Sequence, residues 1–102
     1  MNMTSGLGSL AYNRTKESVE ATAYSTSKVA LNMLTVHQAS NLKHKGTVVV
    51  CVDPGWVKTD MGGPGAVLEK EDSIGGMLKC LRGLKSTDSG KFFACDGSEK
   101  AW

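Results

Sequence analysis

The sequence predicts an α/β protein built around a small parallel sheet, and three observations support this. Patterns typical of strand, helix, strand, helix and strand follow one another along the chain. Residues 47–52 are β-branched and apolar without alternation, as in a strand that helices cover on both faces. The segments between the expected strands carry apolar residues at helical spacing. The length of 102 residues allows one domain at most.

The first half of the chain is predicted to contain a strand end, an irregular segment and a long helix. Residues 1–5 lead directly into Gly6-Leu7-Gly8, as when a strand enters a loop, and residues 9–22 are polar and irregular. A helix is expected over 24–44, and Gly46 is a suitable stop residue. Two neighbouring stripes carry its pattern: Ala30, Met33, Leu34 and His37, then Leu31, Thr35, Gln38 and Leu42.

The second half is predicted to contain a buried strand, a glycine-rich loop, a second helix and a last strand. The strand over 47–52 ends at the break Asp53-Pro54-Gly55, and a loop rich in glycine occupies 61–65. The second helix opens at Glu71, and the last strand covers 91–95. The helix's apolar positions are Ile74, Met77, Leu78, Leu81 and Leu84.

Three strands and two long helices make an incomplete architecture. Right-handed crossovers tend to place both helices on one face of a sheet. The other face and two strand edges would then be exposed, which folded proteins avoid. We therefore expect the chain to be part of a larger unit.

Composition excludes several classes of protein. The chain has 12 Lys and Arg against 10 Asp and Glu, a net charge of +2, which predicts neither a nucleic-acid nor a membrane partner. The longest apolar run, 48–52, is far below the ~20 residues of a membrane-spanning helix, and no secretory signal is recognised. Cys51, Cys80 and Cys95 form no CxxC motif, so we expect no metal site and buried thiols in a reducing, cytoplasmic compartment.

The strongest local signal is the pentapeptide 24–28, Tyr-Ser-Thr-Ser-Lys. Tyr24 and Lys28 are four residues apart on a predicted helix, which places the hydroxyl and the ammonium on one face. A phenol is a poor acid–base catalyst at neutral pH, and a neighbouring ammonium favours the phenolate. The pair is therefore a candidate acid–base group.

The context of this pair adds a crevice and a serine. Ser5 and the loop 54–59 both follow expected strands, and ligands bind outside the carboxyl ends of parallel strands. Ser9 is a competing serine, ranked lower because Ser5 directly follows the strand. A hydrolase triad with His37 or His44 is disfavoured, because the sequence has no Gly-x-Ser-x-Gly elbow.

Together these motifs resemble the short-chain dehydrogenase/reductase family. The matching residues are Ser5 in the string 4–9, Tyr24 with Lys28, and Pro54-Gly55 in the string 53–61 (Asp-Pro-Gly-Trp-Val-Lys-Thr-Asp-Met). The string 27–33 (Ser-Lys-Val-Ala-Leu-Asn-Met) and the C-terminus are similar to the subgroup of sniffer-type carbonyl reductases and C-factor proteins. The resemblance covers nearly the whole chain.

The resemblance implies the C-terminal portion of a Rossmann-like, doubly wound sheet and a hydride transfer between NAD or NADP and a small carbonyl or alcohol. Tyr24 would be the acid/base, Lys28 would lower the pKa of Tyr24 and hold the cofactor ribose, and Ser5 would bind the substrate oxygen. The cofactor-binding residues would be Tyr24, Lys28, Pro54, Gly55, Val57 and Thr59. A homodimer through the helix 24–44 is also implied.

The sequence departs from the family pattern in two places. Ser5 and Tyr24 are 19 positions apart, so an insertion within 13–20 is assumed. No glycine-rich phosphate turn opens the chain, because Gly6 follows only five residues, and we take this stretch as the serine loop. Residues 1–102 are therefore expected to be the C-terminal catalytic part of one dinucleotide-binding domain, inactive alone. The alternative is a non-catalytic truncated piece or a dimerisation module.

Overall fold

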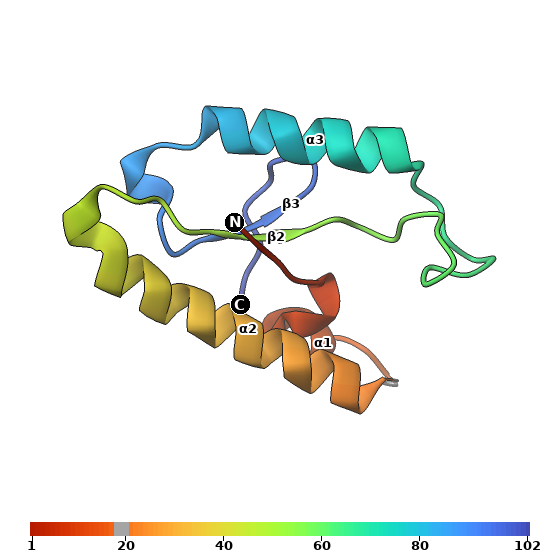
Figure 1. Ribbon diagram of the computed structural model, residues 1–102. Helices are drawn as coiled ribbons and strands as arrows, with labels where there is room; N and C mark the ends of the chain where they lie inside the picture. Colours follow the sequence, from red (N-terminus) through yellow and green to blue (C-terminus); the bar gives the residue numbers. More distant parts are fainter. Residues whose placement is uncertain (18–20) are drawn as a thin grey trace.

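The computed structural model describes residues 1–17 and 21–102, and it confirms the predicted α/β class (Figure 1). Its strands are β1 (Asn2–Met3), β2 (Cys51–Asp53) and β3 (Phe92–Ala94). Its α-helices are α1 (Leu10–Asn13), α2 (Thr22–Leu42) and α3 (Lys70–Gly83). Short 3-10 turns cover Gly6–Gly8, Lys43–Lys45 and Ser86–Asp88. In the described part of the chain, no helix is both long and apolar enough to cross a bilayer.

The three strands form one parallel sheet in the order β1-β2-β3. Met3 stands opposite Val52, and Val52 stands opposite Phe93. Because the strands are parallel, their carboxyl ends lie at one edge of the sheet. The segments that follow β1 and β2 both start at this edge, as the sequence predicts.

The two long helices lie on opposite faces of the sheet, α3 above and α2 below in Figure 1. Val50 and Val52 pack with Met77 of α3, whereas Cys51 meets Thr35 of α2, with Sγ and Oγ1 2.9 Å apart. The prediction that both helices share one face is wrong. Since β1, β2 and β3 step in one direction across the sheet, helices on opposite faces need crossovers of opposite hand, and one of them is the rare left-handed kind.

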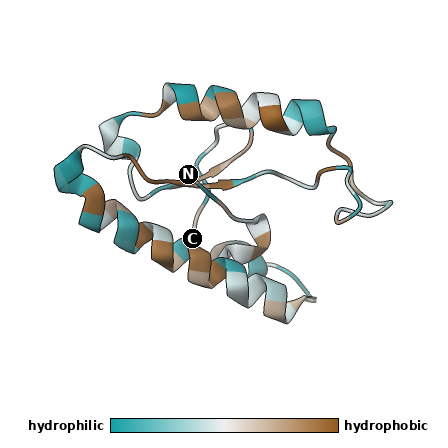
Figure 2. Ribbon diagram, in the orientation of Figure 1, coloured by the Kyte–Doolittle hydropathy of each residue, from teal (hydrophilic) through white to brown (hydrophobic). Residues whose placement is uncertain are grey.

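The interface with α3 is the apolar core of the molecule. Figure 2 shows hydrophobic residues gathered along the segment that leads into β2. The fully packed residues are Val50, Val52, Met77 and Phe93, surrounded by Val48, Cys80, Leu81, Leu84 and Cys95. Two predicted core positions of this helix, Ile74 and Leu78, are exposed instead, and Ser73 is buried. The reason is that Ser73 donates its hydroxyl to the carbonyl oxygen of Pro54 (2.7 Å), which fixes this face of α3 against the site loop.

The interface with α2 is polar, which the periodicity did not predict. Its buried residues are Ser25, Asn32, Thr35 and Ala39. Of the two predicted stripes, the first is exposed, with Met33 at 58% and Leu34 at 48%, and with His37 exposed as well. The second is turned inward, because Thr35 is buried and its other members, Leu31, Gln38 and Leu42, are half-buried. The helix ends as predicted, because Gly46 takes a left-handed φ of 68° just after it.

The C-terminal segment crosses the sheet and closes against α1. The Ala11 N–H donates to the carbonyl oxygen of Trp102 (2.9 Å), and the rings of Trp102 and Phe92 lie 5.4 Å apart. Trp102 thus anchors the C-terminal segment. The short helix α1 was not predicted, because the range 9–22 lacks a helical pattern. Of the range 13–20 assumed to hold an insertion, residues 18–20 lie outside the described residues.

Candidate active site

A pocket of about 1020 Å³ opens at the carboxyl edge of the sheet. It brings together six of the seven expected site residues: Ser5, Tyr24, Pro54, Gly55, Val57 and Thr59. They come from the turn after β1, the first turns of α2 and the loop after β2. Three segments that are far apart in the sequence therefore line the same pocket. The seventh residue, Lys28, stands one helical turn behind Tyr24.

Ser5 is held at the pocket by the turn that follows β1. Its backbone is extended (φ −153°), and its Oγ accepts the Leu7 N–H at 3.1 Å, which caps the 3-10 turn Gly6–Gly8. Among the described residues, no group takes the proton of this hydroxyl. Ser5 can therefore donate a hydrogen bond into the pocket.

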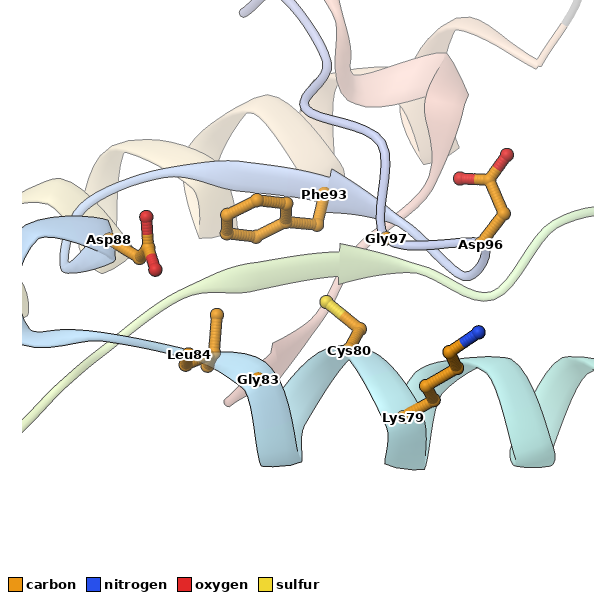
Figure 3. Close-up of a pocket in the computed structure, with 8 residues that line it drawn as sticks. All are labelled: Lys79, Cys80, Gly83, Leu84, Asp88, Phe93, Asp96 and Gly97. Atoms are coloured by element: carbon orange, nitrogen blue, oxygen red, sulfur yellow. The ribbon is translucent and has the colours of Figure 1, made fainter.

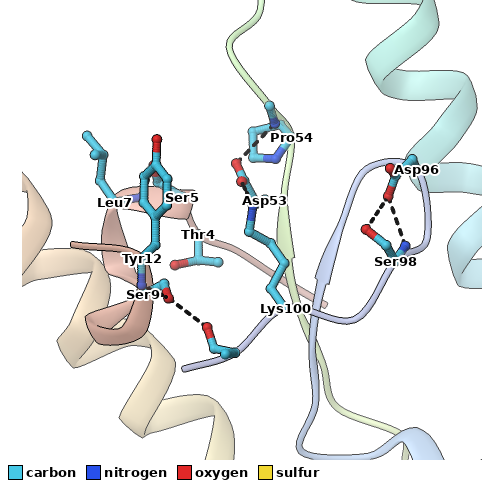
Figure 4. Close-up of polar contacts among 12 residues, drawn as sticks. Thr4, Ser5, Leu7, Ser9, Tyr12, Asp53, Pro54, Asp96, Ser98 and Lys100 are labelled. Carbon is cyan, nitrogen blue, oxygen red and sulfur yellow. Dashed lines mark hydrogen bonds and ion pairs between the residues drawn. The ribbon is translucent and has the colours of Figure 1, made fainter. Parts of the chain in front are cut away.

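Ser9, the competing serine, has a structural role. It is buried at 2% exposure, its Oγ accepts the Tyr12 N–H (3.0 Å), and its hydroxyl donates to the carbonyl oxygen of Ala101 (2.7 Å). Figure 4 shows this hydroxyl turned toward the C-terminal segment. The geometry therefore favours Ser5 over Ser9 as the pocket serine.

Tyr24 and Lys28 lie on one face of α2, as their spacing predicts. The Lys28 Nζ is 5.5 Å from the centroid of the Tyr24 ring, and it donates to the carbonyl oxygen of Met3 at 3.3 Å. The Tyr24 side chain is 40% exposed and lines the pocket. The ammonium is thus fixed to the end of β1, within electrostatic reach of the aromatic ring.

Asn32 joins the serine loop to α2. It accepts the Thr4 hydroxyl at 2.6 Å through Oδ1, and its Nδ2 donates to the carbonyl oxygen of Gly8 at 3.0 Å. A Cβ on Gly8 would stand 3.0 Å from the Lys28 Cβ, so the glycine lets the loop touch the helix. Sequence reasoning did not single out Asn32. Its partners are far away in the chain, so no local pattern signals its role.

The loop after β2 is shaped by its own hydrogen bonds. Gly55 has a φ of 79°, and its N–H donates to Asp53 Oδ1 at 3.0 Å. Further along, Trp56 Nε1 donates to the carbonyl oxygen of Gly62 (2.7 Å), and the Gly62 N–H donates to Thr59 Oγ1 (3.0 Å). The glycine-rich segment is thereby folded back under the indole ring.

The N–H and C=O of Val57 point away from Leu68, the residue opposite it in a parallel bridge. The Lys58 N–H donates to the carbonyl oxygen of Leu68 (2.9 Å), and the Leu68 N–H donates to that of Trp56 (3.0 Å). In an extended chain, successive residues point their polar groups to opposite sides. The N–H and C=O of Val57 therefore point together toward the other side, where the C=O also accepts the Thr59 hydroxyl at 3.3 Å. A carboxamide, which offers one donor and one acceptor, fits such a pair.

Four pocket residues with phenolic or charged side chains were not predicted as site residues: Tyr12, Lys16, Asp53 and Lys100. Tyr12 and Lys16 repeat the four-residue spacing of Tyr24 and Lys28, with the Lys16 Nζ 4.5 Å from the Tyr12 ring centroid. That repeat was readable in the sequence. The ion pair of Asp53 Oδ2 with Lys100 Nζ (3.0 Å) joins residues far apart in the chain, and no local pattern signals it.

The opposite side of the sheet has a smaller hollow, of about 300 Å³, between α3 and the end of β3 (Figure 3). Cys80 lines it, and burial raises the pKa of the Cys80 thiol, as it does for Cys51 and Cys95. Thiols with a raised pKa are poor nucleophiles. Among the described residues, no three His, Cys, Asp or Glu side chains are grouped so that they could hold a metal ion.

Comparison with known proteins identifies relatives across the whole chain. The family model described as short chain dehydrogenase matches residues 3–66. The C-signal of Myxococcus xanthus is 46% identical over 101 residues, covering 99% of this chain and 59% of that protein.

Two solved structures show the same fold. The NADPH-bound carbonyl reductase from chicken fatty liver gives a TM-score of 0.90 at 40% identity, covering 98% of this chain and 41% of that one. The carbonyl reductase Sniffer of D. melanogaster gives 0.89 at 37% identity, covering 98% and 39%. The chain thus spans about two fifths of these structures.

Proposed function

The chain belongs to the short-chain dehydrogenase family, and from this premise we propose that its pocket transfers hydride between a nicotinamide cofactor and a small carbonyl or alcohol. The observation that supports this best is the meeting of Ser5, Tyr24 and the Val57 backbone at one pocket on the carboxyl edge of the sheet. Membership of this family supports an oxidoreductase activity. The reaction and the roles below are the proposal.

Tyr24 is the proposed acid/base. In the direction of carbonyl reduction, its hydroxyl gives a proton to the substrate oxygen as the carbonyl carbon is reduced. The Lys28 ammonium, fixed by the carbonyl oxygen of Met3, stabilises the phenolate that remains. Ser5 donates a hydrogen bond to the same substrate oxygen and stabilises the negative charge that grows there.

The loop after β2 is the proposed seat of the cofactor, NADP or NAD. When bound, the cofactor supplies or accepts the hydride. The Val57 N–H and C=O would hold its carboxamide, with Pro54, Gly55 and Thr59 shaping the same wall. Lys28 would hold the ribose hydroxyls. The carbonyl reductase from chicken fatty liver is NADPH-bound, which supports a nicotinamide cofactor.

The decisive variant is Tyr24→Phe. Removing a general acid costs about 10²–10⁴-fold in turnover, so in a complete chain that also holds the phosphate-binding half we expect reduction of 4-nitrobenzaldehyde to fall by about that factor. Cofactor affinity, measured by NADPH fluorescence, should change little because the ring stays in place. Tyr12→Phe is the matched control, since Tyr12 lines the same pocket and also has a lysine four residues later.

Two results would contradict the proposal. Equal loss of turnover and cofactor affinity in Tyr24→Phe would show that Tyr24 is not the acid/base. No fluorescence change in the purified chain up to millimolar NADPH or NADH would exclude catalysis by this chain alone. That second result would favour the other candidate function, an interaction module.

One surface feature supports the interaction module. Helix α2 exposes Met33, Leu34 and Val36. Exposed apolar side chains gathered on one helix are typical of an interaction surface. The proposed partner is a second copy of the chain, joined through α2.

A further inference from the structure

We propose that Asp53 and Lys100 are a positioning pair for the cofactor loop, in which Lys100 neutralises a carboxylate that organises three site segments. This inference rests on the proposed function, because it assigns the pair a role in cofactor binding. Both residues line the pocket, and the family resemblance assigns a role to neither of them.

Asp53 uses its two carboxylate oxygens on two different segments. Oδ1 accepts the Gly55 N–H at 3.0 Å and fixes the turn that leads to Val57. Oδ2 meets Lys100 Nζ at 3.0 Å. The Asp53 side chain is only 12% exposed, so its charge has lost most of its water. A carboxylate in that position needs a counter-ion.

Lys100 lies in the C-terminal segment, whose backbone is held in place by hydrogen bonds. The Lys100 N–H donates to the carbonyl oxygen of Phe92 at 2.8 Å, and the next two residues are tied to Ser9 and Ala11. Figure 4 shows the Lys100 side chain running from this segment up to Asp53. Because the backbone at Lys100 is already fixed, less conformational entropy is lost when its side chain pairs with Asp53.

The third segment is the serine turn. A Cβ on Gly6 would stand 2.9 Å from Asp53 Oδ2 and 3.5 Å from Lys100 Nζ, so the glycine lets this turn pack directly onto the pair. Ser5 precedes it. The pair thus touches the turn that presents the substrate-binding hydroxyl, the loop that faces the cofactor and the C-terminal segment.

The two charges have unequal consequences for an anionic ligand. Nicotinamide cofactors carry phosphates, and negative charge also grows on the substrate oxygen during reduction. An unpaired Asp53 carboxylate would oppose both, whereas an unpaired Lys100 would not. Loss of the lysine should therefore weaken cofactor binding more than loss of the carboxylate, an asymmetry that a purely structural ion pair would not produce.

The test is a double-mutant cycle on the full chain with NADPH as the probe. We expect Lys100→Met to weaken NADPH binding about fivefold, and Asp53→Asn to weaken it less, since the amide oxygen still accepts the Gly55 N–H. Adding Asp53→Asn to Lys100→Met should restore affinity to within about twofold of the wild type, and Lys100→Arg should keep it. The matched control is Glu99→Gln, which breaks the neighbouring Lys91–Glu99 pair outside the pocket.

A second measurement separates this inference from the proposed function. Hydrogen exchange of the Gly55 amide should be faster in Lys100→Met and recover in the double variant, whether or not the chain binds NADPH. If the wild type binds no NADPH, the proposed function fails. The exchange rate of the Gly55 amide then still tests whether Asp53 and Lys100 position the loop. The inference would be overturned if Lys100→Met changed neither the NADPH affinity nor the exchange rate of the Gly55 amide. It would also be overturned if neither quantity recovered in the double variant.

Discussion

Ser5 and Ser9 occupy the same turn-rich segment but differ in what their hydroxyls contact. Ser5 lines the pocket with a proton that no described group accepts, whereas Ser9 is buried and bonded at both ends. The sequence ranked them only by distance from the expected strand. Two substitutions separate their roles.

Ser9→Ala should lower stability, and Ser5→Ala should lower turnover. Ser9→Ala removes the cap of α1 and the bond to Ala101, at a cost of about 1–2 kcal/mol in the free energy of unfolding. Ser5→Ala should lose turnover by about a hundredfold with a smaller change in stability. Urea denaturation and steady-state kinetics on both variants give the comparison. The reverse pattern would make Ser9 the substrate-binding serine.

Among the site residues, those within short motifs could be predicted and those joined across the chain could not. Tyr24, Lys28 and the loop 54–59 follow from local spacing and from the ends of strands. Lys100 reaches Asp53 only because the C-terminal segment turns back along the sheet, and a sequence pattern cannot show such a long-range pairing. The same holds for Asn32, whose partners lie in the turn after β1 and in β2.

At the scale of elements, the two adjacent glycines of α3 meet different surroundings. A Cβ on Gly76 would clash with the carbonyl oxygen of Cys95, whereas a Cβ on Gly75 would meet nothing within 4 Å. The close approach of α3 to the end of β3 therefore depends on Gly76. Both residues are helical, so the pair isolates packing from helix propensity.

Opposite effects are expected from alanine at these two positions. Gly75→Ala should stabilise the fold by about 0.5–1 kcal/mol, since alanine favours the helix. Gly76→Ala should destabilise it by about 1–3 kcal/mol, because helix and turn must move apart. Chemical denaturation followed by circular dichroism measures both. Stabilisation by both substitutions would show that α3 does not pack as closely as described.

Element order and type were predictable, but which side of a helix faces the sheet was not. The buried face of α2 carries Asn32 and Thr35, which bond to β1, β2 and the serine turn, so hydrogen bonding and not apolar burial sets its orientation. Hydrophobic periodicity cannot detect a face of this kind. Likewise the connection 54–69 is long enough to bring α3 to the opposite face, against the usual handedness of crossovers.

At the scale of the whole molecule, α2 leaves apolar side chains uncovered. Met33, Leu34 and Val36 are between 41% and 58% exposed. The chain spans 59% of its Myxococcus xanthus relative, so its surface need not match that of the relative. The proposed dimer through α2 would bury these three side chains.

Leu34→Glu tests this dimer. A charge placed in the middle of a self-complementary apolar contact meets its own copy across the interface, and we expect association to weaken by about tenfold or more. Sedimentation equilibrium over a range of concentrations measures the change. Ile74→Glu is the control, because it removes an equally exposed apolar side chain from α3, on the other face of the sheet. A monomeric wild type, or equal effects of both substitutions, would exclude α2 as the interface, because only α2 is expected to lie between two copies.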